Sequence, residues 1–342
     1  MKKLYGIIII AVIIIAIGAA AWTLNTPDEK TVLTISTTTS LYQTGLLDTL
    51  KADFEKHYPG IEIALISQGT GLAIQTAQNG DADMILVHDA TREAAFLEDG
   101  FGVNRKIIAY NFFVIVGPED DPAGIEGLGP IEALQAIKAA GEAGETVWIS
   151  RGDSSGTHGM EKRLWNAAGE NATVLREISW YLERGGGMTE TLTMANEKLG
   201  YTLTDMGTYL KVDGEGIINL VILVDAGKET LNVYSAIACD PQNPNLSHVH
   251  FDAAMKFIDF LVSPEAQSTL ADYGVDEFGQ ALFNPAVDLL EHNTDPTIVN
   301  WIEEAAFVDG TECPLNKRYN AGSLTFVTGM ASLNALIYPL LK

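Results

Sequence analysis

Residues 146–165 read TVWISRGDSSGTHGMEKRLW, and they join a predicted strand over 146–149 to a predicted helix over 159–165 through a polar turn. The turn carries the guanidinium of Arg151 among several hydroxyls and two glycines. The first N–H groups of a helix have no partner inside the helix, so they are available to an anion. The same composition also makes a plain N-cap, and this segment alone leaves both interpretations open.

Strand-like and helix-like segments alternate on both sides of this turn. Strands are predicted over 32–36, 61–66, 84–87, 106–116, 202–205, 217–224 and 231–238. Helices are predicted over 41–57, 72–79, 91–99, 131–140, 190–198, 251–261 and 264–273. This alternation is typical of an α/β fold with mainly parallel sheets. The apolar runs 106–116 and 231–238 are expected to cross between two lobes, with a ligand cleft at the carboxyl ends of the strands.

Two more strand-to-helix turns are rich in hydroxyls. One holds Thr38, Thr39 and Ser40 within residues 37–40, and the other holds Thr70 and Gly71 within residues 67–71. Each turn alone is more often only a cap or a turn. Three such turns at equivalent strand ends favour one shared oxyanion site, to which only Arg151 brings a charge. The planar guanidinium fork of arginine suits a tetrahedral oxyanion.

The N-terminus predicts export from the cytoplasm. Lys2 and Lys3 precede an uncharged run from Leu4 to Trp22 that nearly spans a bilayer. We expect a membrane anchor with a tether over 25–30, in preference to a signal peptide cleaved near residues 19–21, which would leave a secreted or periplasmic protein. The folded part is extracytoplasmic in either case.

The charge balance excludes nucleic acid as a partner. The chain has 45 acidic and 21 basic residues and a formal net charge of −24. An anion must therefore be held by donors at short range rather than attracted from a distance. The two cysteines, Cys239 and Cys313, could form one disulfide or pack as two unpaired core residues, and their spacing gives no support to a zinc or redox site.

Six segments, in order, resemble the substrate-binding component of tungstate ABC transporters. They are TTTS (37–40), LVH (86–88), GVNRK (102–106), VIVGP (114–118), SRGDSSGTH (150–158) and LTDMGTYL (203–210). The resemblance covers about residues 31–286. It implies a two-lobed type II periplasmic-binding-protein fold, in which each lobe is a mixed, mainly parallel sheet flanked by helices and two crossovers form the hinge. It also implies capture of tungstate, with molybdate as a weaker competitor, by a monomer that needs no cofactor and delivers the anion to a permease and an ATPase.

The same resemblance implies the binding residues and the boundaries. The expected oxyanion ligands are Thr38, Thr39, Ser40, Thr70, Gly71, Arg151, Ser155, Gly156 and Thr157, without catalytic residues or a bound metal cation. The expected parts are an anchor and tether over 1–30, a first lobe over 31–116 and 233–286, a second lobe over 117–232, and a C-terminal extension of unassigned role over 287–342. Within that extension the run from Leu324 to Leu341 is apolar, but Asn334 and Pro339 argue against a spanning helix. Met206 stands where the family usually has an arginine, which predicts a lower affinity or a different shape selection.

Phosphate is the alternative ligand, because phosphate-binding proteins of this fold carry a similar arginine loop. Hydrogen phosphate requires an acceptor for its proton, whereas a carboxylate facing tungstate would repel it. Asp153 could accept that proton or could brace Arg151, so it does not decide between the two ligands.

An enzyme is disfavoured. Asp153, Ser155 and His158 have the residue types of a hydrolase triad, but they crowd within six positions of one turn and no Gly-x-Ser-x-Gly elbow occurs. His248 and His250 are expected to be surface or capping residues rather than metal ligands. His88 is expected at a strand end near the cleft and is a candidate for an indirect contact with the ligand.

Overall fold

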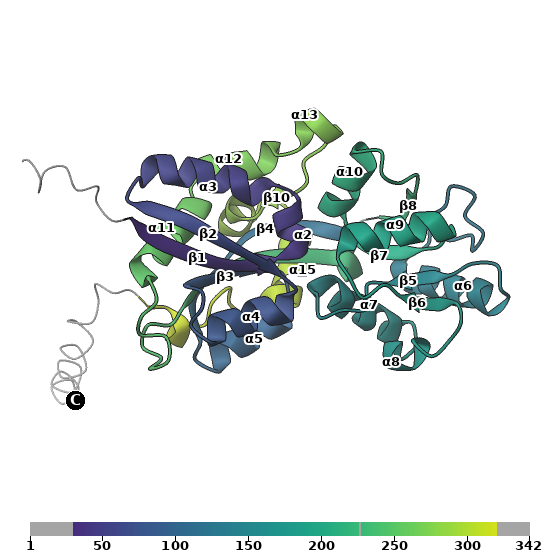
Figure 1. Cartoon of the computed structure of the whole chain (residues 1–342), viewed down its shortest axis with the longest axis horizontal. Helices are drawn as coiled ribbons and strands as arrows, with labels where there is room; N and C mark the ends of the chain where they lie inside the picture. Colours follow the sequence, from purple (N-terminus) through teal and green to yellow (C-terminus); the bar gives the residue numbers. More distant parts are fainter. Residues whose placement is uncertain (1–29, 226, 320–342) are drawn as a thin grey trace, which may run out of the picture.

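The computed structural model describes residues 30–225 and 227–319, which form two lobes side by side along the long axis (Figure 1). The first lobe is built on a sheet with the strand order β10-β4-β9-β3-β1-β2. Its strands are β1 (Thr31–Thr38), β2 (Ile61–Gln68), β3 (Met84–Val87), β4 (Gly102–Gly117), β9 (Leu231–Cys239) and β10 (Asn284–Pro285). Its helices are α2 (Thr39–Gln43), α3 (Leu46–His57), α4 (Thr70–Gln78), α5 (Ala90–Glu98), α11 (Phe251–Leu261), α12 (Pro264–Asp272), α13 (Val275–Phe278), α14 (Val287–His292) and α15 (Pro296–Ala306).

The second lobe contains the loop of Arg151. Its strands are β5 (Trp148–Ser150), β6 (Tyr181–Glu183), β7 (Thr202–Asp205) and β8 (Val221–Val224). Its helices are α6 (Pro130–Glu142), α7 (Gly156–Ala167), α8 (Ala172–Leu175), α9 (Met188–Lys198) and α10 (Met206–Gly214). A core of buried aromatic side chains, including Trp148, Trp165 and Trp180, lies between α7 and the sheet.

Strands β4 and β9 join the two lobes. β4 pairs with β9 as far as Phe112, which lies opposite Leu231, and from Phe113 onward it pairs with β7. Every antiparallel pairing between the described strands involves β4 or β9, and the remaining strand pairs are parallel. The predicted α/β fold with two crossovers is confirmed.

One predicted helix is wrong in its extent. The single helix expected over 41–57 is interrupted at Gly45, which has a φ of 82° and separates α2 from α3. A left-handed residue cannot continue a right-handed helix, and glycine adopts that conformation without steric cost. The apolar face predicted for this segment is correct, because Leu46, Leu47, Leu50 and Phe54 are buried.

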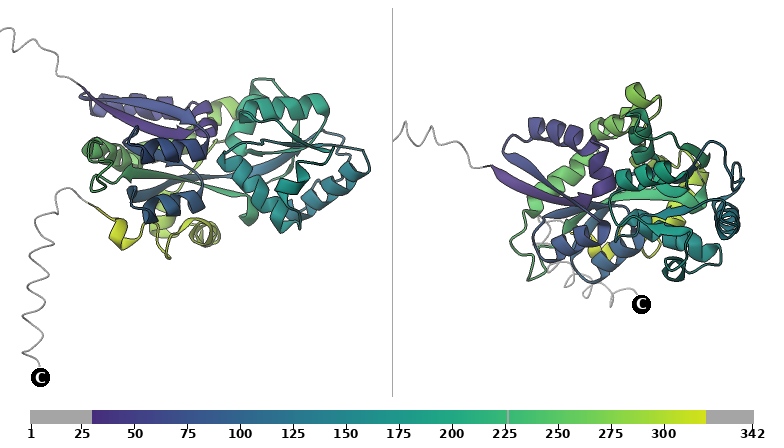
Figure 2. Two further views of the ribbon diagram at one scale, coloured as in Figure 1. Left: turned by 60° about the horizontal axis from the view of Figure 1, so that its bottom comes forward. Right: turned by 45° about the vertical axis from the view of Figure 1, so that its right-hand side comes forward.

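The C-terminal extension packs on the first lobe as far as the structure describes it (Figure 2). Helix α15 places Val299 and Ile302 against Ile107 of β4 and Leu231 of β9. Farther along, the backbone N–H of Ile107 donates to Glu312 Oε1 at 2.6 Å.

Segment 312–319 also fills an interruption in β4. The pairing of β4 with β9 shifts register between Val103 and Lys106. Arg105, within this interruption, donates from Nη1 to the carbonyl of Glu312 at 2.8 Å, and Tyr319 N donates to Asn104 Oδ1 at 2.6 Å. The extension therefore supplies polar partners that the irregular strand lacks.

The two apolar terminal runs, 4–22 and 324–341, lie outside the described residues. Within the described ranges no helix is long and apolar enough to cross a membrane. Cys239 and Cys313 are both buried and unpaired.

Candidate functional site

The three hydroxyl-rich turns meet where the lobes face each other. Arg151 of the second lobe donates from Nη2 to Thr39 Oγ1 of the first lobe at 2.8 Å. Its Nη1 lies 3.5 Å from Thr157 Oγ1 at the start of α7. Gly71 N, at the start of α4, donates to the carbonyl of Ser154 at 3.3 Å. The structure thus brings the predicted residues of all three turns to one place.

Arg151 is buried and braced. Its side chain is 2% exposed, and its Nε donates to Asp153 Oδ2 at 2.9 Å. The other carboxylate oxygen, Asp153 Oδ1, accepts from Ser155 N at 2.9 Å. Of the two roles left open for Asp153, the structure therefore gives it the bracing one.

A second carboxylate, Glu161 on α7, supports the loop from beneath, and the sequence analysis missed it. Glu161 Oε1 accepts from Trp148 Nε1 at 2.9 Å, and its Oε2 accepts from Ser150 Oγ at 3.0 Å and from Arg151 N at 3.4 Å. Burial raises the pKa of the Glu161 carboxyl. The available signal was an acidic residue on the apolar face of a helix, between Met160 and Leu164.

Thr70 and Gly156 form the closest approach between α4 and α7. Thr70 is fully buried, and its Oγ1 has no hydrogen-bond partner in the described part of the chain. A Cβ on Gly156 would lie 3.2 Å from that oxygen and 2.9 Å from Cε1 of His88. The glycine is required by this contact, and the Thr70 hydroxyl remains available as a donor.

The helix starts add backbone donors. Thr38 caps α2 by accepting from Leu41 N at 3.4 Å, and Ser155 caps α7 by accepting from His158 N at 3.1 Å. Gly69 precedes α4 and provides no side-chain cap. The helix dipoles of α4 and α7 both favour negative charge at this point.

His88 lies deeper in the site than the sequence analysis expected. It follows β3, it is 5% exposed, and its Nε2 lies 3.2 Å from Ser40 Oγ. Its Nδ1 lies 2.8 Å from Asn232 Oδ1, and its ring packs on Tyr234 with the centroids 4.9 Å apart. The strand-end position was the only signal in the sequence.

Two further cations join the lobes outside the three turns. Arg92 Nη1 at the start of α5 donates to the carbonyl of Ser154 at 2.8 Å. Lys211 Nζ on α10 donates to the carbonyl of Gln43 at 2.8 Å. These two hydrogen bonds hold the lobes in direct contact in addition to the one between Arg151 and Thr39.

Three other residues, Met206, His248 and His250, lie apart from this cluster. Met206, at the start of α10, has its sulfur 3.8 Å from Gln280 Nε2. His248 contacts the carbonyl of Gly80 at 2.9 Å, and His250 lies 3.3 Å from Asp83. The described residues contain no cluster of three side chains able to hold a metal ion.

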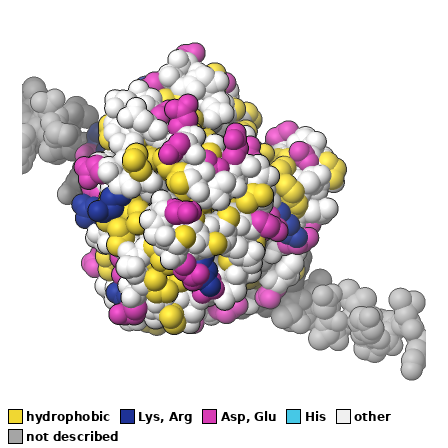
Figure 3. Space-filling view, turned by 90° about the vertical axis from the view of Figure 1, so that its right-hand side faces the viewer, with side chains coloured by type: hydrophobic (Ala, Val, Ile, Leu, Met, Phe, Trp, Pro, Cys, Tyr) yellow, Lys and Arg dark blue, Asp and Glu magenta, His cyan; other side chains and the backbone are white. Residues whose placement is uncertain are grey.

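The outer surface does not gather positive charge on the face at the end of the second lobe. Figure 3 shows Asp and Glu side chains spread among apolar ones there, with few Lys or Arg.

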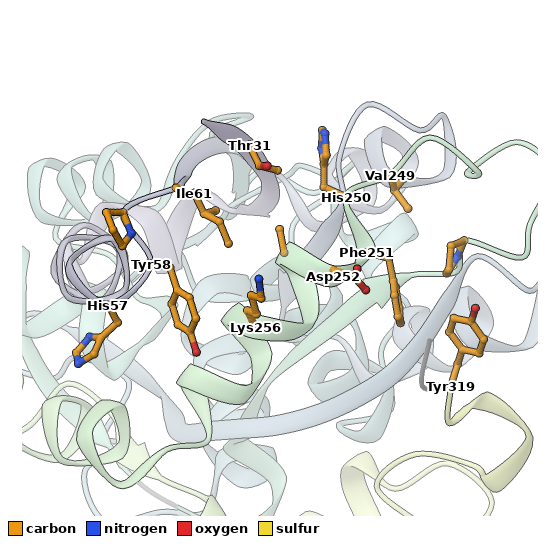
Figure 4. A pocket seen from close by; sticks show the side chains of 14 residues that line it. Thr31, His57, Tyr58, Ile61, Val249, His250, Phe251, Asp252, Lys256 and Tyr319 are labelled. Carbon is orange, nitrogen blue, oxygen red and sulfur yellow. The ribbon is translucent and has the colours of Figure 1, made fainter. Parts of the chain in front are cut away.

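A cavity of about 680 Å³ lies on the first lobe and is lined by Thr31, Tyr58, Lys256 and Tyr319, among others (Figure 4). It includes none of the predicted oxyanion ligands.

Residues 25–265 match the family model of the PBP superfamily domain, and the chain belongs to this superfamily of binding proteins. It is 36% identical over 296 residues to the tungstate-binding protein TupA of Peptoclostridium acidaminophilum, across 83% of this chain and 99% of that protein. It is 44% identical over 258 residues to a Haloferax volcanii protein provisionally named an ABC transporter anion-binding protein, across 74% of this chain and 71% of the relative. The solved tungstate-binding protein TupA of Desulfovibrio alaskensis is 42% identical and superposes with a TM-score of 0.64, over 75% of this chain and 98% of that one. These similarities confirm the resemblance drawn from the six segments.

Proposed function

We propose that this protein captures tungstate between its lobes and delivers it to an ABC importer, without a cofactor or a catalytic residue. The proposed ligands are the nine residues of the three turns: Thr38, Thr39, Ser40, Thr70, Gly71, Arg151, Ser155, Gly156 and Thr157. The observation that carries the proposal is the buried Arg151, which Asp153 braces and which reaches across the lobes to Thr39. Its relatives named as tungstate-binding proteins support the choice of anion.

The donors act on the anion through charge and desolvation. Arg151 supplies a full positive charge in a water-poor site, and the starts of α4 and α7 add partial positive charge. Hydroxyls such as that of Thr70 then replace the hydrogen bonds that the anion loses with water. Contacts from both lobes are made together only when the lobes close, so binding stabilises the closed form.

Phosphate fits this arrangement less well. Both carboxylate oxygens of Asp153 are engaged, one by Arg151 and the other by Ser155 N. Asp153 thus serves to brace Arg151 and the backbone of its own loop, which disfavours it as the acceptor for the proton of hydrogen phosphate. The guanidinium of Arg151 and the backbone N–H groups can only donate, and such ligands favour an oxyanion that carries no proton.

Calorimetry on the full-length protein in detergent tests the proposal, with tungstate, molybdate, phosphate and sulfate as ligands. We expect the tightest binding for tungstate, weaker binding for molybdate, and phosphate and sulfate weaker by roughly 100-fold or more, because a site with mismatched donors leaves polar groups unpaired. Tightest binding of phosphate would replace the proposal by its alternative.

We also propose that residues 4–22 anchor the protein outside the cytoplasm. The composition of that run supports this placement. Recovery of the protein in the membrane fraction after an alkaline wash would agree with an anchor. Recovery in the soluble fraction with a shortened N-terminus would show cleavage instead.

A further inference from the structure

His88 touches the site through a single hydrogen bond and is held at both ring nitrogens. Its Nε2 lies 3.2 Å from Ser40 Oγ, and its Nδ1 lies 2.8 Å from Asn232 Oδ1. It is not among the nine proposed ligands: its Nε2 is engaged by Ser40, which is one of them, and its ring packs beside Gly156, which is another. Its neighbours determine which ring nitrogen carries a hydrogen.

A chain of amides fixes the proton on Nδ1. The carbonyl of Leu282 can only accept, so the Asn111 side-chain atom 3.3 Å from it is the amide nitrogen. Asn111 Oδ1 then accepts from Asn232 Nδ2 at 2.9 Å, and Asn232 Nδ2 also donates to Tyr234 Oη at 2.8 Å. Asn232 Oδ1 is left facing His88 as an acceptor. Nδ1 of His88 must therefore carry a hydrogen.

This arrangement couples the charge of His88 to the direction of the Ser40 hydroxyl. In neutral His88, Nε2 has a lone pair and takes the hydrogen of Ser40, so Ser40 presents only lone pairs to a ligand. In charged His88, Nε2–H donates to Ser40 Oγ, and the hydroxyl hydrogen can turn either to Thr38 Oγ1, 3.4 Å away, or to a bound anion, whose charge makes it the stronger acceptor. Whether Ser40 accepts from the ligand or donates to it thus depends on the charge of the His88 ring.

We propose that His88 is a positioning residue that takes up one proton from solvent when a fully deprotonated oxyanion binds, and so converts Ser40 into a donor toward that anion. The inference rests on the proposed function of the site. The protonation state of His88 then contributes to the choice between oxyanions. With neutral His88, Ser40 can accept the proton of a protonated oxyanion, and with charged His88, Ser40 can donate to tungstate.

The charges around the ring make this proton uptake feasible. Asp205 at the start of α10 and Asp89 before α5 favour the charged ring, while Arg151 opposes it. The ring of Tyr234 packs on it and stays uncharged. Burial is the largest effect and lowers the pKa of His88, so the ring is neutral near pH 7 until another negative charge arrives. A dianion beside Ser40 supplies that charge.

Water can reach the ring without passing the three turns. A cavity of about 370 Å³ between the lobes is lined by His88 and Asn232, together with Thr91, Arg163 and Ala306. This cavity offers a route for the proton from solvent.

Calorimetry with sodium tungstate in two buffers of different ionisation enthalpy, between pH 7 and 9, tests the proposal on the full-length protein. We expect uptake of about one proton per tungstate and an affinity that falls by up to about tenfold per pH unit between the pKa of His88 in the free protein and its higher pKa in the complex. Above the pKa of His88 in the complex, the affinity should level off. His88→Gln should abolish the proton uptake and flatten the pH profile. His292→Gln, which changes an exposed histidine paired with Asp288 on α14, is the matched control and should leave both unchanged.

Ser40→Ala keeps the ring and covers the case in which His88→Gln does not fold. Without the hydroxyl, tungstate affinity should fall and its dependence on pH should shrink. Tungstate binding by the wild-type protein without proton uptake would overturn the role of His88 and leave the proposed function intact. No binding of tungstate at all would overturn the proposed function and this inference with it.

Discussion

The guanidinium of Arg92, on the first lobe, donates from Nη1 to the carbonyl oxygen of Ser154, on the second lobe, at 2.8 Å. The same carbonyl accepts from Gly71 N at 3.3 Å. Asp89 lies 3.6 Å from Nε of Arg92 and keeps that side chain directed toward the other lobe. The loop that carries Arg151 is thus fastened to the first lobe by its own backbone, independently of any ligand contact.

Replacing Arg92 by alanine should therefore weaken tungstate binding without touching the anion. We expect a loss of about 1 kcal/mol, or roughly fivefold in affinity, since one charge-assisted hydrogen bond across the lobes is removed from a partly exposed side chain. The effect should appear mainly as faster dissociation in stopped-flow measurements. Arg176→Ala is the control, because Arg176 pairs with Glu183 within the second lobe. Equal effects of the two changes would argue against a role of the Arg92–Ser154 hydrogen bond in holding the lobes together.

Arg151→Ala should remove most of the affinity, by 100-fold or more, because the nine proposed ligands lose the one permanently charged side chain among them and a planar fork that donates in two directions. Arg151→Lys should recover only part of this loss, since an ammonium cannot reach Asp153 and Thr39 together in the same geometry. Circular dichroism should show an unchanged fold in both variants. Unchanged tungstate affinity in Arg151→Ala by calorimetry would mean that the anion binds elsewhere.

Thr70→Val separates a binding role from a structural one. The Thr70 hydroxyl is fully buried without a hydrogen-bond partner in the described residues, so its removal should leave the protein as stable as before or slightly more stable. Tungstate affinity should nevertheless fall by about five- to tenfold. Thr146→Val is a matched control, because Thr146 Oγ1 is likewise buried and unpartnered but belongs to the approach to β5. A loss of affinity in the control, or none in Thr70→Val, would contradict the assignment.

Glu312→Ala should destabilise the first lobe. Glu312 accepts from Ile107 N and from Lys106 Nζ, at 2.6 and 3.0 Å, and its side chain is 22% exposed. Losing these contacts should lower the free energy of unfolding by about 1–3 kcal/mol in urea titrations. Glu304→Ala, which breaks an exposed pair with Lys228, should change it by less than about 0.5 kcal/mol. If the two variants unfold alike, the extension contributes little to the lobe.

The residues of the three turns could be predicted because their chemistry is local. Runs of hydroxyls and glycines at strand ends, such as 37–40 and 150–158, are visible without knowing what they face. The roles of Glu161 and Arg92 could not be predicted, because each depends on hydrogen-bond partners in segments that lie elsewhere in the sequence. The helix break at Gly45 was not predicted, because the apolar residues of 46–54 recur with a helical period and this period does not show that the preceding glycine is left-handed. The role of 287–319 depends on an irregularity of β4 that the sequence does not display.

The register pair Phe112–Leu231 makes the second lobe an insertion at the tip of a β-hairpin. The chain leaves the first sheet after Phe112 and returns to it at Leu231. These two residues are paired across neighbouring strands, so the two ends of the intervening segment lie side by side. A short turn could replace it without stretching the sheet, and another lobe of the same end spacing could be grafted there. The lobe that holds Arg151 could therefore be exchanged as a unit. The lobe that holds Thr38 and Thr70 contains both ends of the chain segment into which it is inserted.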